Sequence, residues 1–371
     1  MNSRIVKLAK TIVNYSCEIK KGQKVTIDVL GDSPRPLIKA LIKEISNVGG
    51  QAHIILKDAE IMREQLLIMT ADIAKNLAEH DLNRLRDTDV YIMIKAPNNT
   101  SELSDVPEEQ MGYYSKYYSK PVNEHILGRT RWLSIRYPSY AMAQMAHMSF
   151  DAFETMYFDV CTLDYSKLSS AMDHLVDLMK NTDKVRIVGP DTDIEFSIKD
   201  IPVHKCAGKI NLPDGEVYTA PVKDSVNGYI KYNVPSLYHG VQFDDVRLEF
   251  ENGKIVKATS NQTDKMNKVF DTDDGARYIG EFAIGVNPFV LNPINDILFD
   301  EKIMGSFHLT PGFSYENASN GNHSAVHWDL ICIQTKEQGG GEIYFDDVLI
   351  RKDGYFVVES LQVLNPDMLI R

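Results

Sequence analysis

The spacing of hydrophobic residues changes character about halfway along the chain. In the first half, short apolar runs alternate with stretches whose apolar residues recur at helical spacing, the pattern of strands and amphipathic helices. Strands are predicted at residues 25–30, 52–56 and 89–94, and helices at residues 34–48 and 70–85. Strand–helix–strand units of this kind join parallel strands. The first half is therefore predicted to be an α/β domain.

The second half is predicted to be an α+β domain with a largely antiparallel sheet. Short strands are expected at residues 185–188, 194–198, 228–232, 246–250 and 255–258. The last two are separated by Asn252 and Gly253, and an Asn-Gly pair is a strong signal for a tight hairpin turn. Because a helical stretch at residues 165–179 precedes these strands, we expect the domains to comprise residues 1–181 and 182–371.

Composition limits the possible partners and the location. The 371 residues carry a formal net charge of −12, which argues against a nucleic-acid partner, because such proteins usually present a basic patch. No stretch is long and apolar enough to span a membrane, and the N-terminal residues lack the apolar core of a signal peptide. Four cysteines without paired spacing favour a reducing, cytoplasmic setting; they are Cys17, Cys161, Cys206 and Cys332.

The first half shows no sign of a nucleotide site. A phosphate cradle needs several glycines between the first strand and the first helix. The connection here contains only Gly31, and the neighbouring Asp32 would repel a phosphate. We therefore expect the candidate chemistry to lie in the second half.

Residues 326–331 form the most informative stretch of the second half. They are predicted to be a buried strand, so His327 and Asp329 point to one face and Trp328 points to the other. Burying an imidazole and a carboxylate without partners is costly. A divalent cation that takes both as ligands would remove that cost, and so would a His–Asp hydrogen bond at the strand end.

Other polar residues in or beside apolar segments extend this set. Glu216 follows a turn, whereas Glu281 and His308 each lie in an apolar strand, and Tyr315 comes seven residues after His308. Taken singly, Glu216 could cap a turn, Glu281 could face solvent, and His308 could be a core residue. Together with the His327 pair they give two glutamates, two histidines and one aspartate. That is more than one ion needs, and it suits two ions that share a bridging carboxylate.

Two nearby polar segments are interpreted differently. His323 falls in the loop before the predicted strand, so we do not expect it to be a ligand. The run Asp300-Glu301-Lys302 is interpreted as a solvated turn. No Gly-x-Ser-x-Gly elbow is present, which gives little support for a nucleophilic serine.

The segments that carry these residues resemble the thermophilic aminopeptidases, the aminopeptidase T and aminopeptidase S group of dinuclear metallopeptidases. The matching segments are LPDGEVYTAPVKDSVNG (212–228), TDDGARYIGEFAIG (272–285), FDEKIMGSFHLTPGFSY (299–315) and NGNHSAVHWDLI (320–331). The N-terminal half is also similar, through KKGQKVTI (20–27) and RTRWLSIRYPSYAMAQMA (129–146). The resemblance therefore covers essentially the whole chain.

The resemblance implies an aminopeptidase that removes N-terminal residues from short peptides with two divalent ions, Zn²⁺, Co²⁺ or Mn²⁺. It implies a metal-ligand set and a catalytic set. The implied ligands are Glu216, Glu281, His308, His327 and Asp329, and the implied catalytic residues are Glu216, Glu281 and Tyr315. The sequence departs from the family at His308-Leu309-Thr310-Pro311-Gly312, where the proline changes the backbone ahead of Tyr315.

The resemblance further implies a homodimer in which the N-terminal domain helps to enclose the active site. Two other functions stay open from the residues alone. One is another metal-dependent amide hydrolase, such as a dipeptidase or an amidase. The other is a non-enzymatic ligand-binding protein with a structural metal, which the carboxylate-rich, cysteine-free constellation disfavours.

Overall fold

The computed structural model describes residues 2–370 and divides into two compact units. The first unit comprises the residues up to Leu163 together with the segment Gly208–Pro213. The second unit comprises Asp164–Ala207 and the chain from Asp214 onward. The boundary expected after residue 181 lies one helix later than this division. That helix, α9 (Tyr165–Lys180), belongs to the second unit, where Lys205 Nζ donates to the carbonyl oxygen of Ser169 at 2.8 Å.

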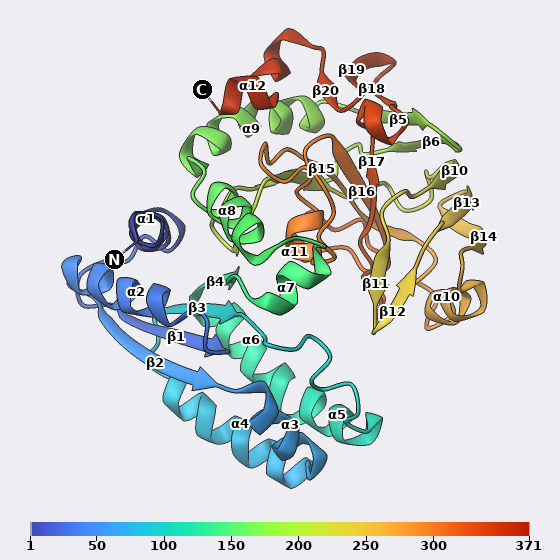
Figure 1. Ribbon diagram of the computed structural model, residues 1–371. Helices are drawn as coiled ribbons and strands as arrows, with labels where there is room; N and C mark the ends of the chain where they lie inside the picture. The colour runs from blue at the N-terminus through green and yellow to red at the C-terminus, as the bar shows by residue number, and fades with distance from the viewer. Residues whose placement is uncertain (1, 371) are drawn as a thin grey trace. The chain divides into compact units, whose positions relative to one another are not determined.

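The first unit is an α/β domain built on a parallel sheet, as the alternation of strands and helices predicts (Figure 1). Its strands, in spatial order, are β2 (Gln51–Lys57), β1 (Lys24–Leu30), β3 (Val90–Lys95), β4 (Arg131–Arg136) and β8 (Asn211–Leu212). The central strand β1 is buried along almost its whole length, as expected for a parallel strand with both faces covered.

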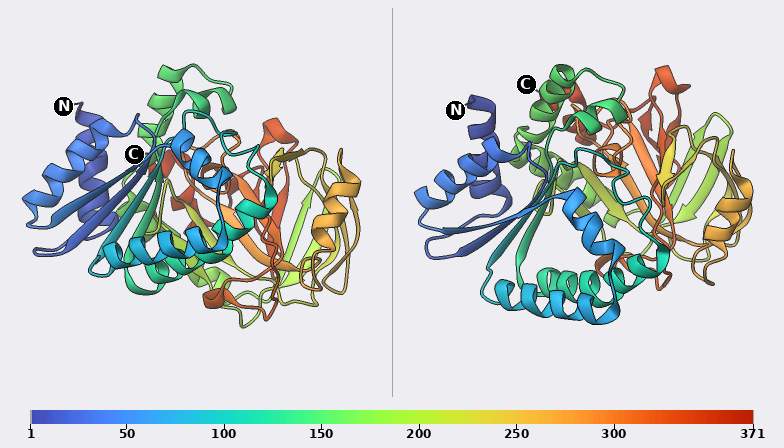
Figure 2. Two further views of the ribbon diagram at one scale, coloured as in Figure 1. Left: turned by 90° about the horizontal axis from the view of Figure 1, so that it is seen from below. Right: turned by 60° about the horizontal axis from the view of Figure 1, so that its bottom comes forward.

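Helices cover both faces of this sheet, with α1 and α2 on one face and α4 and α6 on the other (Figure 2). The α-helices of the unit are α1 (Ser3–Lys10), α2 (Arg35–Asn47), α3 (Ala59–Leu67), α4 (Ala71–Leu85), α5 (Glu108–Tyr114), α6 (Lys120–Arg129), α7 (Tyr140–Met145) and α8 (Phe150–Cys161). Two π-helical segments are η1 (Thr11–Ser16) and η2 (Ser115–Ser119). Within residues 2–370, no helix combines the length and apolarity that crossing a bilayer requires.

The second unit contains three antiparallel sheets, which confirms the predicted α+β class. The eight-stranded sheet has the order β14 (Lys254–Thr259), β13 (Arg247–Glu251), β10 (Asn227–Lys231), β6 (Thr192–Ser197), β5 (Lys184–Gly189), β18 (Glu342–Phe345), β19 (Val348–Lys352) and β20 (Tyr355–Phe356). The five-stranded sheet has the order β17 (Leu330–Ile333), β16 (Ser306–Pro311), β15 (Ile279–Gly285), β9 (Glu216–Thr219) and β7 (His204–Cys206). The small sheet pairs β11 (Ser236–Tyr238) with β12 (Val241–Phe243).

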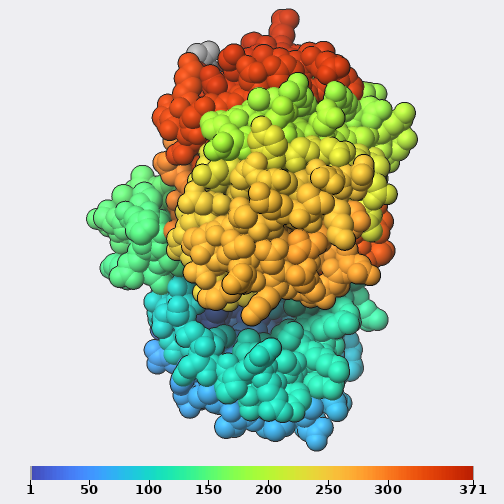
Figure 3. Space-filling model, turned by 90° about the vertical axis from the view of Figure 1, so that its right-hand side faces the viewer, coloured from blue at the N-terminus to red at the C-terminus, as the bar shows by residue number. Residues whose placement is uncertain are grey.

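Short helices complete the second unit. Besides α9 they are α10 (Thr263–Phe270), α11 (Ile297–Asp300), α12 (Pro366–Leu369) and the 3₁₀ segments η3 (Glu316–Ala318), η4 (Lys336–Gln338) and η5 (Glu359–Leu364). The predicted Asn-Gly turn joins β13 and β14, and both Asn252 and Gly253 have the positive φ that such turns require. This hairpin and α10, in yellow and gold, form one outer face of the unit (Figure 3).

The five-stranded sheet forms the core of the second unit. Its strands β15 and β16 are buried at every position, so they lie in the interior of the unit. Phe282 of β15 contacts Phe196 of the eight-stranded sheet, with ring centroids 5.0 Å apart. One face of β15 therefore packs against the other sheet, and the polar side chains of β15 and β16 must find their partners on the opposite face.

The strand predicted at residues 326–331 begins later than expected, at Leu330. The preceding residues run beside the end of β16, where an isolated bridge joins His327 to Gly312 and the backbone N–H of Trp328 donates to the carbonyl oxygen of Pro311 at 3.1 Å. Trp328 nevertheless points away from His327 and Asp329, as the strand pattern predicts. Trp328 is buried among aromatic rings, stacked on Tyr238 at 4.6 Å, and its indole N–H donates to Ser236 Oγ at 2.8 Å.

Replacing Trp328 with alanine should lower the free energy of unfolding by roughly 3–5 kcal/mol, the usual cost of removing a buried large aromatic side chain. Urea unfolding followed by circular dichroism would measure this change. Leu237→Ala is a matched control in the adjoining strand β11, because that side chain is largely exposed and its loss should have little effect. Equal stability of Trp328→Ala and the unmodified protein would contradict the assigned packing.

Candidate metal centre

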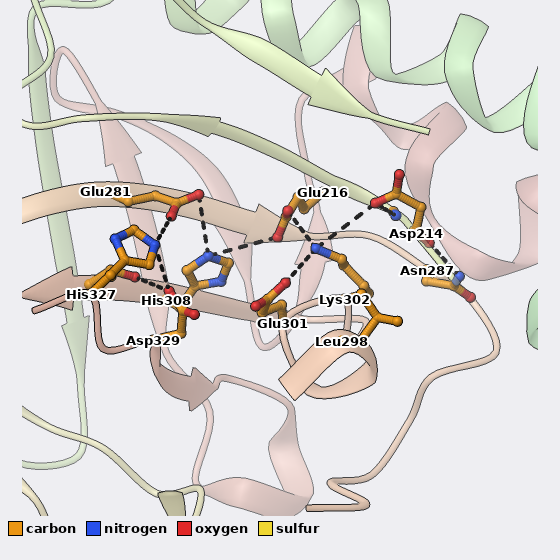
Figure 4. A network of polar contacts seen from close by, with 12 residues as sticks. Asp214, Glu216, Glu281, Asn287, Leu298, Glu301, Lys302, His308, His327 and Asp329 are labelled. Atoms are coloured by element: carbon orange, nitrogen blue, oxygen red, sulfur yellow. Dashed lines mark hydrogen bonds and ion pairs between the residues drawn. The ribbon is translucent and has the colours of Figure 1, made fainter. Parts of the chain in front are cut away.

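Three adjacent strands place Glu216, Glu281 and His308 on one face of the five-stranded sheet (Figure 4). Gly285 of β15 pairs with Glu216 of β9, and Ala283 of β15 pairs with His308 of β16. Paired residues of antiparallel strands share a face, and so do residues two positions apart in one strand. Glu281 therefore shares its face with both partners, and all three side chains are buried.

His327 and Asp329 reach the same cluster from the segment that leads into β17. Gly312 allows this approach, because its φ is +115° and a Cβ at that position would meet the carbonyl oxygen of Val326 at 1.9 Å. The ring nitrogen Nδ1 of His327 lies 3.0 Å from the carbonyl oxygen of Phe313 and donates to it. That hydrogen bond selects the tautomer of the neutral imidazole whose Nε2 carries a free lone pair, as metal-binding histidines require.

The donor atoms are spaced like ligands of shared ions. His327 Nε2 lies 3.3 Å from Glu281 Oε2 and 3.4 Å from Asp329 Oδ1. His308 Nε2 lies 3.7 Å from Glu281 Oε1 and 3.7 Å from Glu216 Oε2. Two ligands that bind one tetrahedral ion at about 2.0–2.1 Å lie about 3.3 Å apart, whereas hydrogen-bonded atoms are usually closer. The two oxygens of Glu281 thus face two different imidazoles.

Two of these donor atoms are buried without a hydrogen-bond partner among the described residues, His327 Nε2 and Glu216 Oε2. A buried polar atom left in that state costs free energy. A divalent ion would give both atoms a partner, so the residues present fit a metal by their chemistry as well as by their spacing.

The carboxylates control the charge of both imidazoles. Burial alone would lower the pKa of each histidine, but Glu281 and Glu216 raise the pKa of His308 to about 9. Asp329 and Glu281 likewise raise the pKa of His327 to about 9 against the effect of burial. Burial would raise the pKa of Glu281, yet the two imidazoles lower it to about 2. In the metal-free protein the cluster therefore holds protons that a metal ion must displace.

The family model for the thermophilic metalloprotease (M29) family matches residues 1–356. The chain belongs to this family. Aminopeptidase 2 of Geobacillus stearothermophilus is 24% identical, and the alignment covers 94% of each chain. Aminopeptidase AmpS of Bacillus subtilis is 34% identical over 33% of this chain and 30% of its own length. A metalloprotease requires a metal centre, and the cluster described above has the donor atoms to form one.

Two solved structures share the fold of this metalloprotease. Wild-type AmpT from Thermus thermophilus superposes with a TM-score of 0.80 at 20% identity, covering 96% of this chain and 99% of its own. The 2,5-dihydroxypyridine dioxygenase of Pseudomonas putida superposes with a TM-score of 0.62 at 12% identity, covering 97% and 99%. Because the same fold serves a dioxygenase, the chemistry has to be argued from the site and not from the fold.

Tyr315 lies beside the cluster in this metalloprotease. Its ring centroid is 4.9 Å from that of His327 and 5.7 Å from that of Phe313, and the residue is 40% exposed. Pro311, which departs from the family pattern, continues β16 and pairs with Ile279. The proline therefore leaves Tyr315 next to the candidate ligands.

The interpretation of residues 300–302 as a solvated turn is wrong. Lys302 is fully buried, and its ammonium donates to Glu216 Oε1 at 2.5 Å and to Glu301 Oε2 at 2.6 Å. It also lies 3.9 Å from Asp214 Oδ1. Burial would lower the pKa of Lys302, but Glu216 and Glu301 raise it well above the ordinary value. The apolar residues on both sides of this run were the sequence signal for burial.

Cys206, Asp214 and Glu216 form a second group of possible ligands, and its two carboxylates already pair with the ammonium of Lys302. Burial and the carboxylate of Asp214 raise the pKa of the Cys206 thiol well above its ordinary value. Because a positive charge already lies beside both carboxylates, this group is a poorer metal site than the histidine-containing cluster.

Proposed function

We propose that this metalloprotease is an aminopeptidase that releases N-terminal residues from short peptides. The observation that carries the proposal is the arrangement of Glu281, whose two oxygens face His308 and His327 separately. A carboxylate placed in this way suits a bridge between two ions. The proposal is further supported by the names of the relatives, which are aminopeptidases.

In this proposal the donors form two groups that share Glu281. His327, Asp329 and one oxygen of Glu281 would hold one ion, with donor atoms within 4.8 Å of one another. His308, Glu216 and the second oxygen of Glu281 would hold the other. A bound divalent ion, Zn²⁺, Co²⁺ or Mn²⁺, would polarise the scissile carbonyl and lower the pKa of a coordinated water, to about 7 in the case of Zn²⁺.

The protein must also move a proton from the attacking water to the leaving amine. The sequence offers Glu216 and Glu281 for this role, and the structure adds Glu301. Burial raises the pKa of Glu301 to about 8, a value at which a carboxyl group exchanges a proton near neutral pH. The hydroxyl of Tyr315, beside His327, would donate a hydrogen bond to the oxyanion that develops on the carbonyl.

The arrangement of the whole enzyme belongs to the same proposal. We expect a cytoplasmic homodimer in which the N-terminal α/β unit helps to wall off the metal centre. Enclosure of this kind would exclude bulk water and folded proteins from the reacting groups. Short peptides with a free amino terminus would then be the preferred substrates.

Free and N-acetylated peptides of the same sequence separate this function from the other amide hydrolases. The free peptide should lose its first residue, whereas acetylation should slow cleavage by about 100-fold or more, because the peptide then lacks the free amino group that the site recognises. Chromatography of the released amino acids would follow the reaction. Equal rates on both peptides would indicate an amidase, and cleavage confined to dipeptides would indicate a dipeptidase.

A further inference from the structure

We propose that the buried ammonium of Lys302 makes the two metal positions unequal. It weakens the ion held through Glu216 and His308, and it leaves the ion held through His327 and Asp329 tightly bound. This inference rests on the proposed function, because it assumes that the cluster holds two ions. It goes further by naming the residue that sets their relative affinity.

Lys302 is a buried neighbour of Glu216, at the end of the cluster that would hold an ion through Glu216 and His308. The side chain is fully buried, and its ammonium donates to one oxygen of Glu216 and to Glu301, with Asp214 also close (Figure 4). Two of the three ammonium donors are used by Glu216 and Glu301, and Asp214 Oδ1 lies 3.9 Å from the ammonium as a further ion-pair partner. Only Oε2 of Glu216 remains without a hydrogen bond, and it faces His308.

The consequence for a metal is electrostatic. A divalent ion on Oε2 of Glu216 would share one buried carboxylate with a positive charge already bound to Oε1, and like charges repel strongly in a buried site. The ammonium also pairs with the carboxylate of Asp214, which would otherwise attract a cation. Both effects lower the affinity of this position.

The His327 end carries no comparable cation. Among residues 2–370, no ion pair joins His327 or Asp329 to a lysine or an arginine. The nearest hydrogen-bond partners are neutral, since Thr310 donates to Asp329 Oδ1 at 2.7 Å and His327 donates to the carbonyl oxygen of Phe313. These partners orient the ligands without opposing a positive ion, which favours tight binding.

Lys302 also orients Glu216 through its hydrogen bond, and this contact favours metal binding, whereas the charge of Lys302 opposes it. Losing a contact that orients a ligand commonly weakens metal binding by about 10–100-fold. The substitution Lys302→Gln separates the orienting effect from the charge effect, because the amide is uncharged but can still donate to Glu216. This variant should therefore bind the ion held through Glu216 and His308 more tightly.

Equilibrium dialysis of the full chain against buffered free Zn²⁺, with zinc content read by mass spectrometry, tests the inference without measuring activity. The unmodified protein should bind zinc in two separate steps of one ion each, with affinities that differ by about tenfold or more because of the charge repulsion at the weaker position. His308→Ala should remove the weaker step and retain the tighter one. Lys302→Gln should shift the weaker step to lower free Zn²⁺ by about tenfold or more.

Lys352→Gln is the matched control, because it removes the same charge from an exposed ion pair with Glu342 and should leave both steps unchanged. Two zinc ions bound in a single step by the unmodified protein would overturn the inference about Lys302 and leave the proposed function standing. The inference about Lys302 would also be overturned if the weaker step of Lys302→Gln occurred at the same free Zn²⁺ as in the unmodified protein, or at a higher one. Absence of any zinc binding at the cluster would overturn the proposed function itself. If Lys302→Gln fails to fold, Lys302→Met takes its place, because it also removes the charge from a side chain of similar length and should likewise shift the weaker step to lower free Zn²⁺.

Discussion

Stripping the metal from this protein with a chelator should abolish hydrolysis of aminoacyl amides, and adding Zn²⁺, Co²⁺ or Mn²⁺ should restore it. The reason lies in the donor set, because carboxylates and imidazoles bind divalent ions less tightly than thiolates do, so at least one ion should exchange. None of the proposed ligands, which are Glu216, Glu281, His308, His327 and Asp329, is a cysteine. The measurement is initial rate on leucine amide before dialysis, after dialysis with chelator, and after each metal is returned.

The unfolding curve of the dialysed protein provides the control for this experiment. A folded but inactive sample that regains activity with metal would support the account, because the ion then acts in the reaction. Full activity in a sample shown by elemental analysis to contain no metal would contradict it.

Replacing His327 or Asp329 with alanine should lower turnover by more than about 100-fold while the protein stays folded. Loss of an outer contact alone commonly costs about 10–100-fold in metal affinity or activity, so loss of a direct ligand should cost more. Both side chains lie at the edge of the core, whereas Trp328 between them is fully buried. Substitution of His327 or Asp329 should therefore lower activity, whereas substitution of Trp328 should lower stability.

His323→Ala is the matched control for these ligand variants. It removes an exposed imidazole four residues before His327, and it should leave activity and stability unchanged. Substantial activity in His327→Ala, together with a stable but inactive Trp328→Ala, would show that the metal has been assigned to the wrong face of this segment.

The sequence predicts much of this architecture because local patterns determine it. The apolar runs and helical spacing of the first half predict that β1, β2 and β3 are parallel, and the Asn-Gly pair predicts the hairpin of β13 and β14. Strand alternation likewise predicts that His327 and Asp329 share a face that Trp328 avoids. These features depend on residues close together in the sequence.

Other features depend on distant residues, and the sequence alone does not reveal them. Lys302 belongs to a charged run that resembles a surface turn, yet its partner Glu216 lies 86 residues away. The start of β17 at Leu330 follows from the approach of residue 326 to Gly312 across the sheet. The division between the two units likewise depends on contacts of α9 with the later strands.

We expect His327, Asp329 and Glu281 to bind a catalytic ion. Anomalous diffraction from crystals of active, zinc-loaded enzyme, recorded on both sides of the zinc absorption edge, would locate that ion. A strong anomalous peak should lie within bonding distance of His327 Nε2 and of both carboxylates, and it should be lost in crystals of His327→Ala. Fully active crystals that show no anomalous peak at these residues, or show zinc bound only elsewhere, would contradict the proposed metal centre.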